Sequence, residues 1–341
     1  MCNFSFFYLL FVHFLAFIHP ETKKIEPVAT KVVFQSTDGG NSWQDVSQGL
    51  PLKFEPKSIF VDKGVVYIGN FEGIVKSSSN DPRPKWEQEA LLNQSVTKFF
   101  PGRAGLYARS FDLGILQNFA GSGIWIPRFI TLKPKLPRTV LETSETTIFV
   151  GTDDGIYKSE DKGVNWKKVS EEKHVSNLLL ANGVLIAGNG NGIMRSIDNG
   201  EHWNYVLSEN RATLKIKYIK NQFVSINFNG NTINKPISNN YHLINRLTCS
   251  TDNGSSWNTM DKNLAPLRFI STKEDKIDKV RIINDIEQVG EFLFCSLDGG
   301  IYRSIDWGKT WQMVFEKKGN NLFEFAVSGQ KIYALSIFSG C

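Results

Sequence analysis

The chain has 341 residues, of which 41% are hydrophobic and 21% are charged, and its formal net charge at pH 7 is +5. This composition is typical of a folded protein and excludes a disordered or fibrous chain. The small net charge gives no indication of nucleic-acid binding, and neither the four cysteines nor the five histidines have the spacing of a metal site.

The N-terminal segment is a candidate export signal. Residues 4–18 read FSFFYLLFVHFLAFI and are followed by Pro20. Fifteen residues are short for a bilayer span, which needs about 20. They fit the apolar core of a secretory signal, although no basic residue precedes the run. We predict a signal peptide at residues 1–20 and a single domain at 21–341, exported to the periplasm, cell surface or extracellular space. The alternative is an uncleaved N-terminal anchor. The protein would then associate with a membrane only through this segment.

A motif ending in tryptophan repeats along the rest of the chain. The pattern S-x-D-x-G-x-x-W occurs five times, and it ends at Trp43, Trp166, Trp203, Trp257 and Trp311. Two degenerate copies end at Trp86 and Trp125. Ser and Asp side chains bond to nearby backbone groups in tight turns, and the Gly allows a positive φ. We therefore interpret the five motif aspartates as structural turn residues rather than acids or metal ligands: Asp38, Asp161, Asp198, Asp252 and Asp306.

Each motif lies inside a unit of four short strands, named A to D in order. Two strands joined by a Gly-containing loop precede the motif, as in IFVGTDDGIYKS (148–159). A short strand with alternating polar and apolar residues follows the tryptophan. Units of roughly 40–45 residues are typical of propeller blades. The chain ends after strands A and B, and it begins, after residue 30, with strands C and D. We predict an all-β, seven-bladed β-propeller of four-stranded antiparallel blades, with the last blade closed by N- and C-terminal strands.

These repeats resemble the BNR or Asp-box family of β-propellers over residues 31–341. That family includes sialidases, xyloglucanase-type glycosidases, sortilin-type receptors and the photosystem II assembly factor. The resemblance implies the fold but not an activity, because one fold hosts many functions. It also implies that strand A lines the axis, that A–B and C–D turns share one face, and that B–C loops and D–A connections share the other.

Candidate ligand residues lie on the face of the B–C loops. Acidic, amide and aromatic groups on one rim suit sugar hydroxyls or a basic peptide, although they can also be ordinary polar turn residues. The loop candidates are Asn70, Phe71, Glu72, Phe111, Asp112, Asp153, Asp154, Asn189, Asn191 and Asp298. The arginines that can approach this face are Arg109, at the end of a strand B, and Arg138 and Arg281, near the start of strands A. No cofactor or metal is implied.

A glycoside hydrolase of sialidase type is the alternative function. The resemblance to that branch of the family would imply three arginines that grip a carboxylate, a tyrosine nucleophile paired with a glutamate, and an aspartate acid. Bidentate arginine–carboxylate pairing is the physical reason for the three arginines. No tyrosine can be assigned as nucleophile from the sequence.

Two long stretches interrupt the regular spacing. Residues 227–245 enlarge a B–C loop and residues 264–279 enlarge the following D–A loop. By the strand order both project from the ligand face as neighbours, either as a partner surface or as tolerated insertions. We predict a non-catalytic propeller that binds a protein or a glycan through this face.

Overall fold

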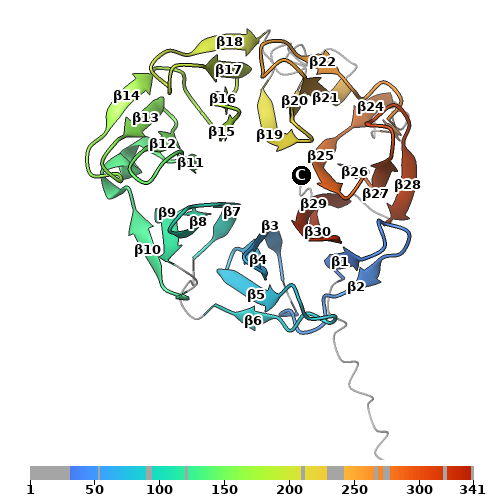
Figure 1. Ribbon diagram of the computed structural model, residues 1–341. Helices are drawn as coiled ribbons and strands as arrows, with labels where there is room; N and C mark the ends of the chain where they lie inside the picture. The colour runs from blue at the N-terminus through green and yellow to red at the C-terminus, as the bar shows by residue number, and fades with distance from the viewer. Residues whose placement is uncertain are drawn as a thin grey trace, which may run out of the picture.

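The computed structural model describes residues 31–52, 54–89, 94–119, 122–208, 212–228, 242–264, 268–271, 277–317 and 321–338. The predicted signal peptide lies outside these residues. The described strands form seven sheets arranged around one axis, each with an antiparallel A to D core (Figure 1). The predicted seven-bladed propeller is therefore confirmed.

The blades follow one another around the ring in chain order, each with strand A at the axis and strand D outermost (Figure 1). Blade 1 holds β3 (Pro56–Asp62), β4 (Val65–Asn70), β5 (Ile74–Ser78) and β6 (Glu87–Gln88). Blade 2 holds β7 (Val96–Phe100), β8 (Gly105–Ser110), β9 (Gly114–Phe119) and β10 (Trp125–Arg128). Blade 3 holds β11 (Thr139–Glu142), β12 (Ile148–Gly151), β13 (Ile156–Ser159) and β14 (Lys167–Ser170). Blade 4 holds β15 (Asn177–Ala181), β16 (Val184–Gly188), β17 (Ile193–Ser196) and β18 (Asn204–Leu207).

The remaining blades include one that is enlarged and one that is composite. Blade 5 holds β19 (Thr213–Ile219), β20 (Gln222–Phe228), β21 (His242–Ser250) and β22 (Asn258–Thr259), with β23 (Arg268–Ser271) and β24 (Ile277–Arg281) added. Blade 6 holds β25 (Ile283–Val289), β26 (Phe292–Leu297), β27 (Gly300–Ser304) and β28 (Gln312–Glu316). Blade 7 holds β29 (Asn321–Ser328), β30 (Lys331–Phe338), β1 (Val33–Ser36) and β2 (Gln44–Asp45). A short 3₁₀ segment, η2 (Ile130–Lys135), connects blades 2 and 3.

Blade 7 closes the ring as predicted. Strand β1 pairs antiparallel with β30, with Val33 opposite Leu335 and Ser36 opposite Ile332. This pairing covers the backbone edge of β30 that would otherwise be free to associate with another chain.

The core is divided into seven apolar clusters, each between two adjacent blades. Between blades 7 and 1, for example, Val33, Val66 and Tyr333 are fully buried together. This arrangement follows from the alternation of side chains along each strand, which gives every inner strand two faces that both contact a neighbouring blade. Closing the ring is therefore what buries both faces of every blade.

The motif turns lie between strands C and D. In the last one, the Ser304 hydroxyl donates to Asp306 Oδ1 (2.8 Å) and accepts from Gly308 N–H (2.8 Å). Asp306 also accepts from the backbone and hydroxyl of Thr310 (2.8 and 2.6 Å). Hydrogen bonds from Thr310 lower the pKa of Asp306 to about 2. The other four motifs repeat the contacts of their Ser, Asp and Gly.

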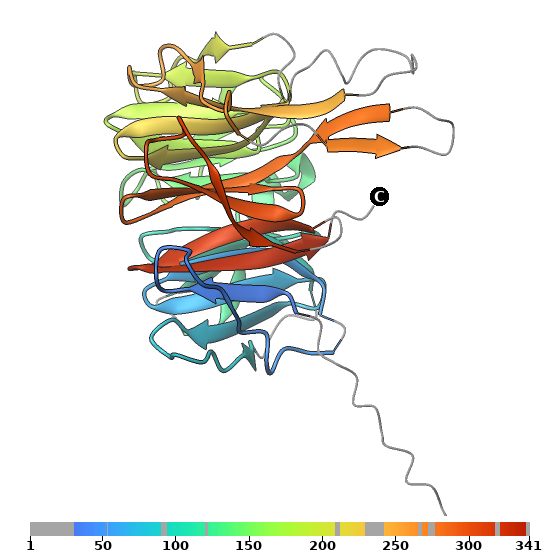
Figure 2. The ribbon, with the colours of Figure 1, turned by 90° about the vertical axis from the view of Figure 1, so that its right-hand side faces the viewer.

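The enlarged blade 5 differs from the expectation of two long loops. Strands β20 and β21 extend into the first stretch, where Phe228 pairs with Asn245. The second stretch forms the β23–β24 hairpin, and β24 pairs in parallel with β21, with Ile244 opposite Arg281. β22 pairs only with Thr248 and Cys249 of β21, so the N-terminal part of the extended β21 has backbone N–H and C=O groups that β24 can join. The strands that the structure describes in both stretches, the ends of β20 and β21 and the β23–β24 pair, project from one side of the ring (Figure 2).

Candidate functional site

Several of the predicted B–C loop residues hold their own turns. The Asn70 side chain is buried and accepts from Glu72 N–H at 2.7 Å. Asn189 is buried in the same way: it accepts from the backbone of Asn191 at 2.9 Å and donates to the Tyr205 hydroxyl. These asparagines replace missing backbone partners in tight loops, and they shape the rim without presenting an amide to a ligand.

Asp154 is also engaged inside its loop. It accepts from the Thr152 hydroxyl (2.7 Å) and the Tyr157 hydroxyl (3.0 Å). Burial alone would raise the pKa of Asp154, but these two hydrogen bonds, together with the nearby Lys168 and Lys135, hold the pKa below its usual value. Asp298 follows β26 in the equivalent loop of blade 6, where its backbone N–H donates to the Ile282 carbonyl at 3.2 Å.

Other loop residues are open to solvent. Phe71 is 53% exposed and Phe111 is 78% exposed, and both lie in B–C loops, of blades 1 and 2 respectively. The Lys57 ammonium lies 4.0 Å from the centre of the Phe71 ring. Glu72, Asp112 and Asn191 are exposed as well. Ile130, the first residue of the 3₁₀ segment after blade 2, and Leu136, which follows that segment, add further exposed apolar groups on this face.

A cluster of basic residues, Arg109, Arg138 and His174, lies around Asp153 in blades 2 and 3, on the face of the B–C loops. Arg138 forms an ion pair with Asp153, whose carboxylate also lies 3.0 Å from His174 Nδ1. Burial would raise the pKa of Asp153, but Arg138 and His174 together lower it. The pKa of Arg109 is lowered by burial first and by the nearby Arg138 second. Two of the three predicted arginines are therefore close together.

Arg281, the third predicted arginine, ends β24 immediately before blade 6, and its side chain is outside the described part of the structure.

A tyrosine–glutamate pair, which sequence reasoning did not identify, lies at the other end of blade 3. The Tyr107 hydroxyl donates to Glu142. Glu142 is the last residue of β11, whereas Arg138 directly precedes that strand. Burial and the Glu142 hydrogen bond raise the pKa of Tyr107 far above its usual value. A tyrosine nucleophile needs the opposite shift, and this pair is separated from the arginines by the length of the strand.

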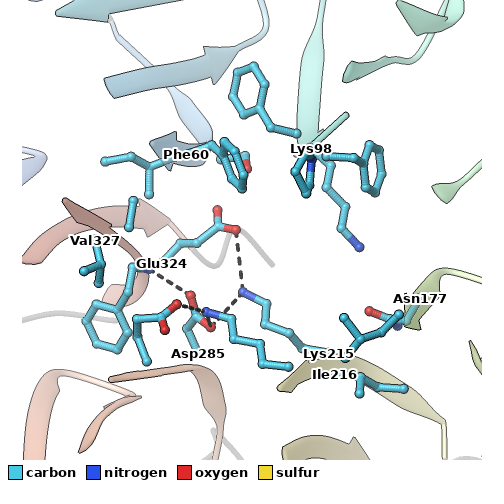
Figure 3. A pocket seen from close by; sticks show the side chains of 18 of the residues that line it. Phe60, Lys98, Asn177, Lys215, Ile216, Asp285, Glu324 and Val327 are labelled. Carbon is cyan, nitrogen blue, oxygen red and sulfur yellow. Dashed lines mark hydrogen bonds and ion pairs between the residues drawn. The ribbon is translucent and has the colours of Figure 1, made fainter. Parts of the chain in front are cut away.

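The axis holds a cavity of about 490 Å³ that the sequence analysis also missed (Figure 3). Each strand A contributes at least one polar residue to it, and one such residue per strand lies at a matching level. In five blades this residue stands four positions before the last residue of strand A. The seven residues, from blade 1 to blade 7, are Ser58, Lys98, Thr139, Asn177, Lys215, Asp285 and Glu324.

A network of ion pairs occupies the side of the cavity formed by blades 5 to 7 (Figure 3). Lys215 and Lys217 lie 3.1 and 2.9 Å from the buried Asp285 Oδ1. Lys215 also approaches Glu324 at 3.5 Å, and Lys217 approaches Glu287 at 2.7 Å. The two lysines thus form ion pairs with three carboxylates. Lys98, from blade 2 across the cavity, has none of these contacts.

On the opposite side of the cavity, apolar surface lies beside the polar residues Ser58, Lys98, Thr139 and Asn177. Phe60 and Phe100, from blades 1 and 2, line it together with Leu179 from blade 4. The signal for this site was present in the sequence as charged residues alternating within inner strands, as in TLKIKYI (213–219) and INDIEQV (283–289). An inner strand buried on both sides is expected to be almost entirely apolar.

Within the described ranges, no three His, Cys, Asp or Glu side chains lie close enough together to hold a metal ion. The same residues include no helix with the length and hydropathy to cross a membrane.

Comparison with known proteins places the chain among β-propellers. No family model matches it, and no curated protein matches its sequence. Solved structures with a similar fold include YCF48 bound to a D1 peptide, with 15% identity over 85% of this chain and 94% of that chain and a TM-score of 0.54. An ancestral GH74 enzyme has 13% identity over 87% of this chain and 44% of that chain, with a TM-score of 0.54. The extracellular domain of a one-component system from B. thetaiotaomicron has 12% identity over 84% and 39%, with a TM-score of 0.52. Identities this low show the fold alone.

Proposed function

We propose that this protein is an exported, non-catalytic binding module that docks a polypeptide partner on the face formed by its B–C loops and D–A connections. The observation that carries the proposal is the exposure of Phe71 and Phe111 in neighbouring blades of that face. Large aromatic side chains in solvent bury much apolar area when a partner covers them, and they are enriched among the residues that dominate binding energy.

The enlarged blade 5 supports the same face. The β23–β24 hairpin and the extended β20–β21 pair project beyond the ring on one side (Figure 2), which makes the rim uneven. An uneven rim favours one orientation of a bound partner, whereas a symmetric rim would not. Among propellers of similar fold, YCF48 has been seen with a peptide bound, and the tryptophan motif resembles the Asp-box family, which includes binding proteins.

Export is part of the proposal. The apolar run at residues 4–18 has the length of a signal-peptide core. A propeller of similar fold forms an extracellular domain in a bacterial sensor. Both observations favour a partner outside the cytoplasm.

The sialidase alternative finds less support. Of the arginines that it requires, Arg138 is already paired with Asp153. Tyr107, the tyrosine of the described tyrosine–glutamate pair, lies toward the A–B turns and has a raised pKa. No described observation favours a glycan over a polypeptide.

The proposal is tested with two double variants that remove apolar groups from opposite faces. F71S/F111S alters the proposed face. I197S/I305S is the matched control, because these isoleucines are 68% and 62% exposed but lie in C–D turns on the other face. Extracts of the source cells are passed over immobilised wild type and both variants, and each retained protein is then measured for affinity.

We expect a partner that binds wild type and I197S/I305S equally and binds F71S/F111S at least tenfold more weakly, since a buried aromatic anchor contributes about 1–4 kcal/mol. Retention of the same proteins by all three, or loss only from I197S/I305S, would contradict the proposal.

A further inference from the structure

Lys98 is the cation of the axial cavity that has no carboxylate partner. Its ammonium donates to the Ser176 carbonyl at 3.0 Å. Among the described residues, no Asp or Glu oxygen forms an ion pair with it. Figure 3 shows its side chain extending into the cavity from the blade 2 side, away from the dashed contacts. The Lys98 side chain is half-buried, and an ammonium partly withdrawn from water without a counter-charge is costly, so this position favours an anion.

The charges around Lys98 do not neutralise it. Its pKa is lowered to about 8, mainly by burial and then by Lys215, with a smaller contribution from Arg109. Glu324 and Asp285 act in the opposite direction. Asp285 is already bound by two lysines and by the backbone N–H groups of Ile286 and Phe325, each at 2.8 Å. Burial raises the pKa of Glu324, which weakens the second acid as a counter-charge.

The space beside Lys98 has the size and chemistry of a small-molecule site. A volume of about 490 Å³ falls within the ~300–1,000 Å³ that is usual for such sites. Phe60, Phe100 and Leu179 line it with apolar surface, and Lys98 supplies one cationic group. Asp285, Glu287 and Glu324 on the far side would repel a second negative charge.

We propose that the axial cavity binds a small organic monocarboxylate, with its carboxylate on the Lys98 ammonium and its apolar or aromatic body against Phe60, Phe100 and Leu179. A charge-assisted hydrogen bond from Lys98 supplies orientation, and the apolar surface supplies burial. This site is separate from the polypeptide face, because neither Phe71 nor Phe111 lines the cavity.

The test is isothermal titration calorimetry of the full chain with 3-phenylpropionate and with 3-phenylpropanamide, which has the same shape without the charge. Lys98→Met removes the cation and keeps the length of the side chain. Lys57→Met is the matched control, since this lysine stands outside the cavity lining. We expect the acid to bind wild type and K57M within twofold of each other, and to bind K98M at least tenfold more weakly. Equal binding of acid and amide, undiminished binding by K98M, or no binding at millimolar acid would overturn the proposal.

A pH series on the wild type makes the test independent of how K98M folds. With a pKa of about 8, Lys98 is ~90% protonated at pH 7 and ~10% at pH 9. Since only the ammonium form attracts the anion, the affinity for 3-phenylpropionate should fall about tenfold across this range. A constant affinity would show that Lys98 does not hold the carboxylate.

Discussion

Replacing Asp285 with asparagine should destabilise the whole propeller. The Asp285 side chain is 1% exposed and lies within 3.1 Å of two lysine ammonium groups, Lys215 and Lys217. Asparagine keeps the shape and one acceptor oxygen, but it removes the negative charge that both lysines face. The two lysines come from β19 of blade 5 and the aspartate from β25 of blade 6, so the change weakens a contact between blades.

The expected loss follows from the burial of this group. Removing one partner of a buried ion pair costs about 3–5 kcal/mol. Lys215 and Lys217 retain Glu324 and Glu287, at 3.5 and 2.7 Å, so we expect the lower end, about 3 kcal/mol. At roughly 2–4 °C per kcal/mol for domains of 150–250 residues, the melting temperature should fall by about 6–12 °C, or somewhat less in this larger ring.

The pH dependence gives a second readout with a definite sign. Burial would raise the pKa of Asp285, but Lys215 and Lys217 outweigh it and lower the pKa. A carboxyl whose pKa is depressed by folding stabilises the native state above its unfolded pKa, about 4, and loses that contribution as the pH falls. The gap between wild type and D285N should therefore be full at pH 7 and shrink below about pH 4.

Thermal unfolding followed by circular dichroism measures both effects. Asp112→Asn is the control, because Asp112 is exposed in a B–C loop and its loss should change stability by less than about 0.5 kcal/mol. If D285N melted together with D112N at pH 7, or if its loss of stability were the same at pH 3 as at pH 7, Asp285 would not stabilise the ring through its charge.

Two further predictions concern the turns and the closure of the ring. An added Cβ would lie 2.4 Å from the Phe149 ring in Gly200→Ala but would meet nothing within 4 Å in Gly183→Ala, and both glycines have positive φ. Denaturant unfolding should therefore show G200A about 1–3 kcal/mol less stable than G183A, and equal stabilities would refute the packing at this turn. Deletion of residues 1–48 removes β1 and β2 and exposes the edge of β30, so sedimentation velocity should detect concentration-dependent association, and a monomer that melts like wild type would contradict the closure.

The fold was predictable because the sequence repeats its most constrained element. Each motif turn requires a serine, an aspartate and a glycine in fixed order, so the turns were visible without any knowledge of the strands. Each end of the chain supplies two strands of blade 7, and the two pairs complete one sheet because β1 pairs with β30. The β23–β24 hairpin was not predicted, because its parallel pairing with β21 depends on an edge that only the folded blade 5 provides.

The axial cavity could not be assembled from the sequence for a different reason. Its polar residues come from seven separate units, and the charges within one strand, such as TLKIKYI (213–219), do not show which residues of the other strands lie opposite them. Only the closed ring brings Lys98 opposite Asp285 and Glu324. In the B–C loops, composition indicated the right face but could not separate residues that hold a turn, such as Asn70, from exposed ones, such as Phe111.

The most direct measurement of the docking proposal is hydrogen–deuterium exchange of the protein with and without a partner isolated through the paired-variant experiment. We expect slower exchange at residues 71–73 and 110–114, in the B–C loops of blades 1 and 2, and unchanged exchange in the C–D turns at 197–202 and 305–310. Protection confined to the C–D turns would place the partner on the opposite face and contradict the account.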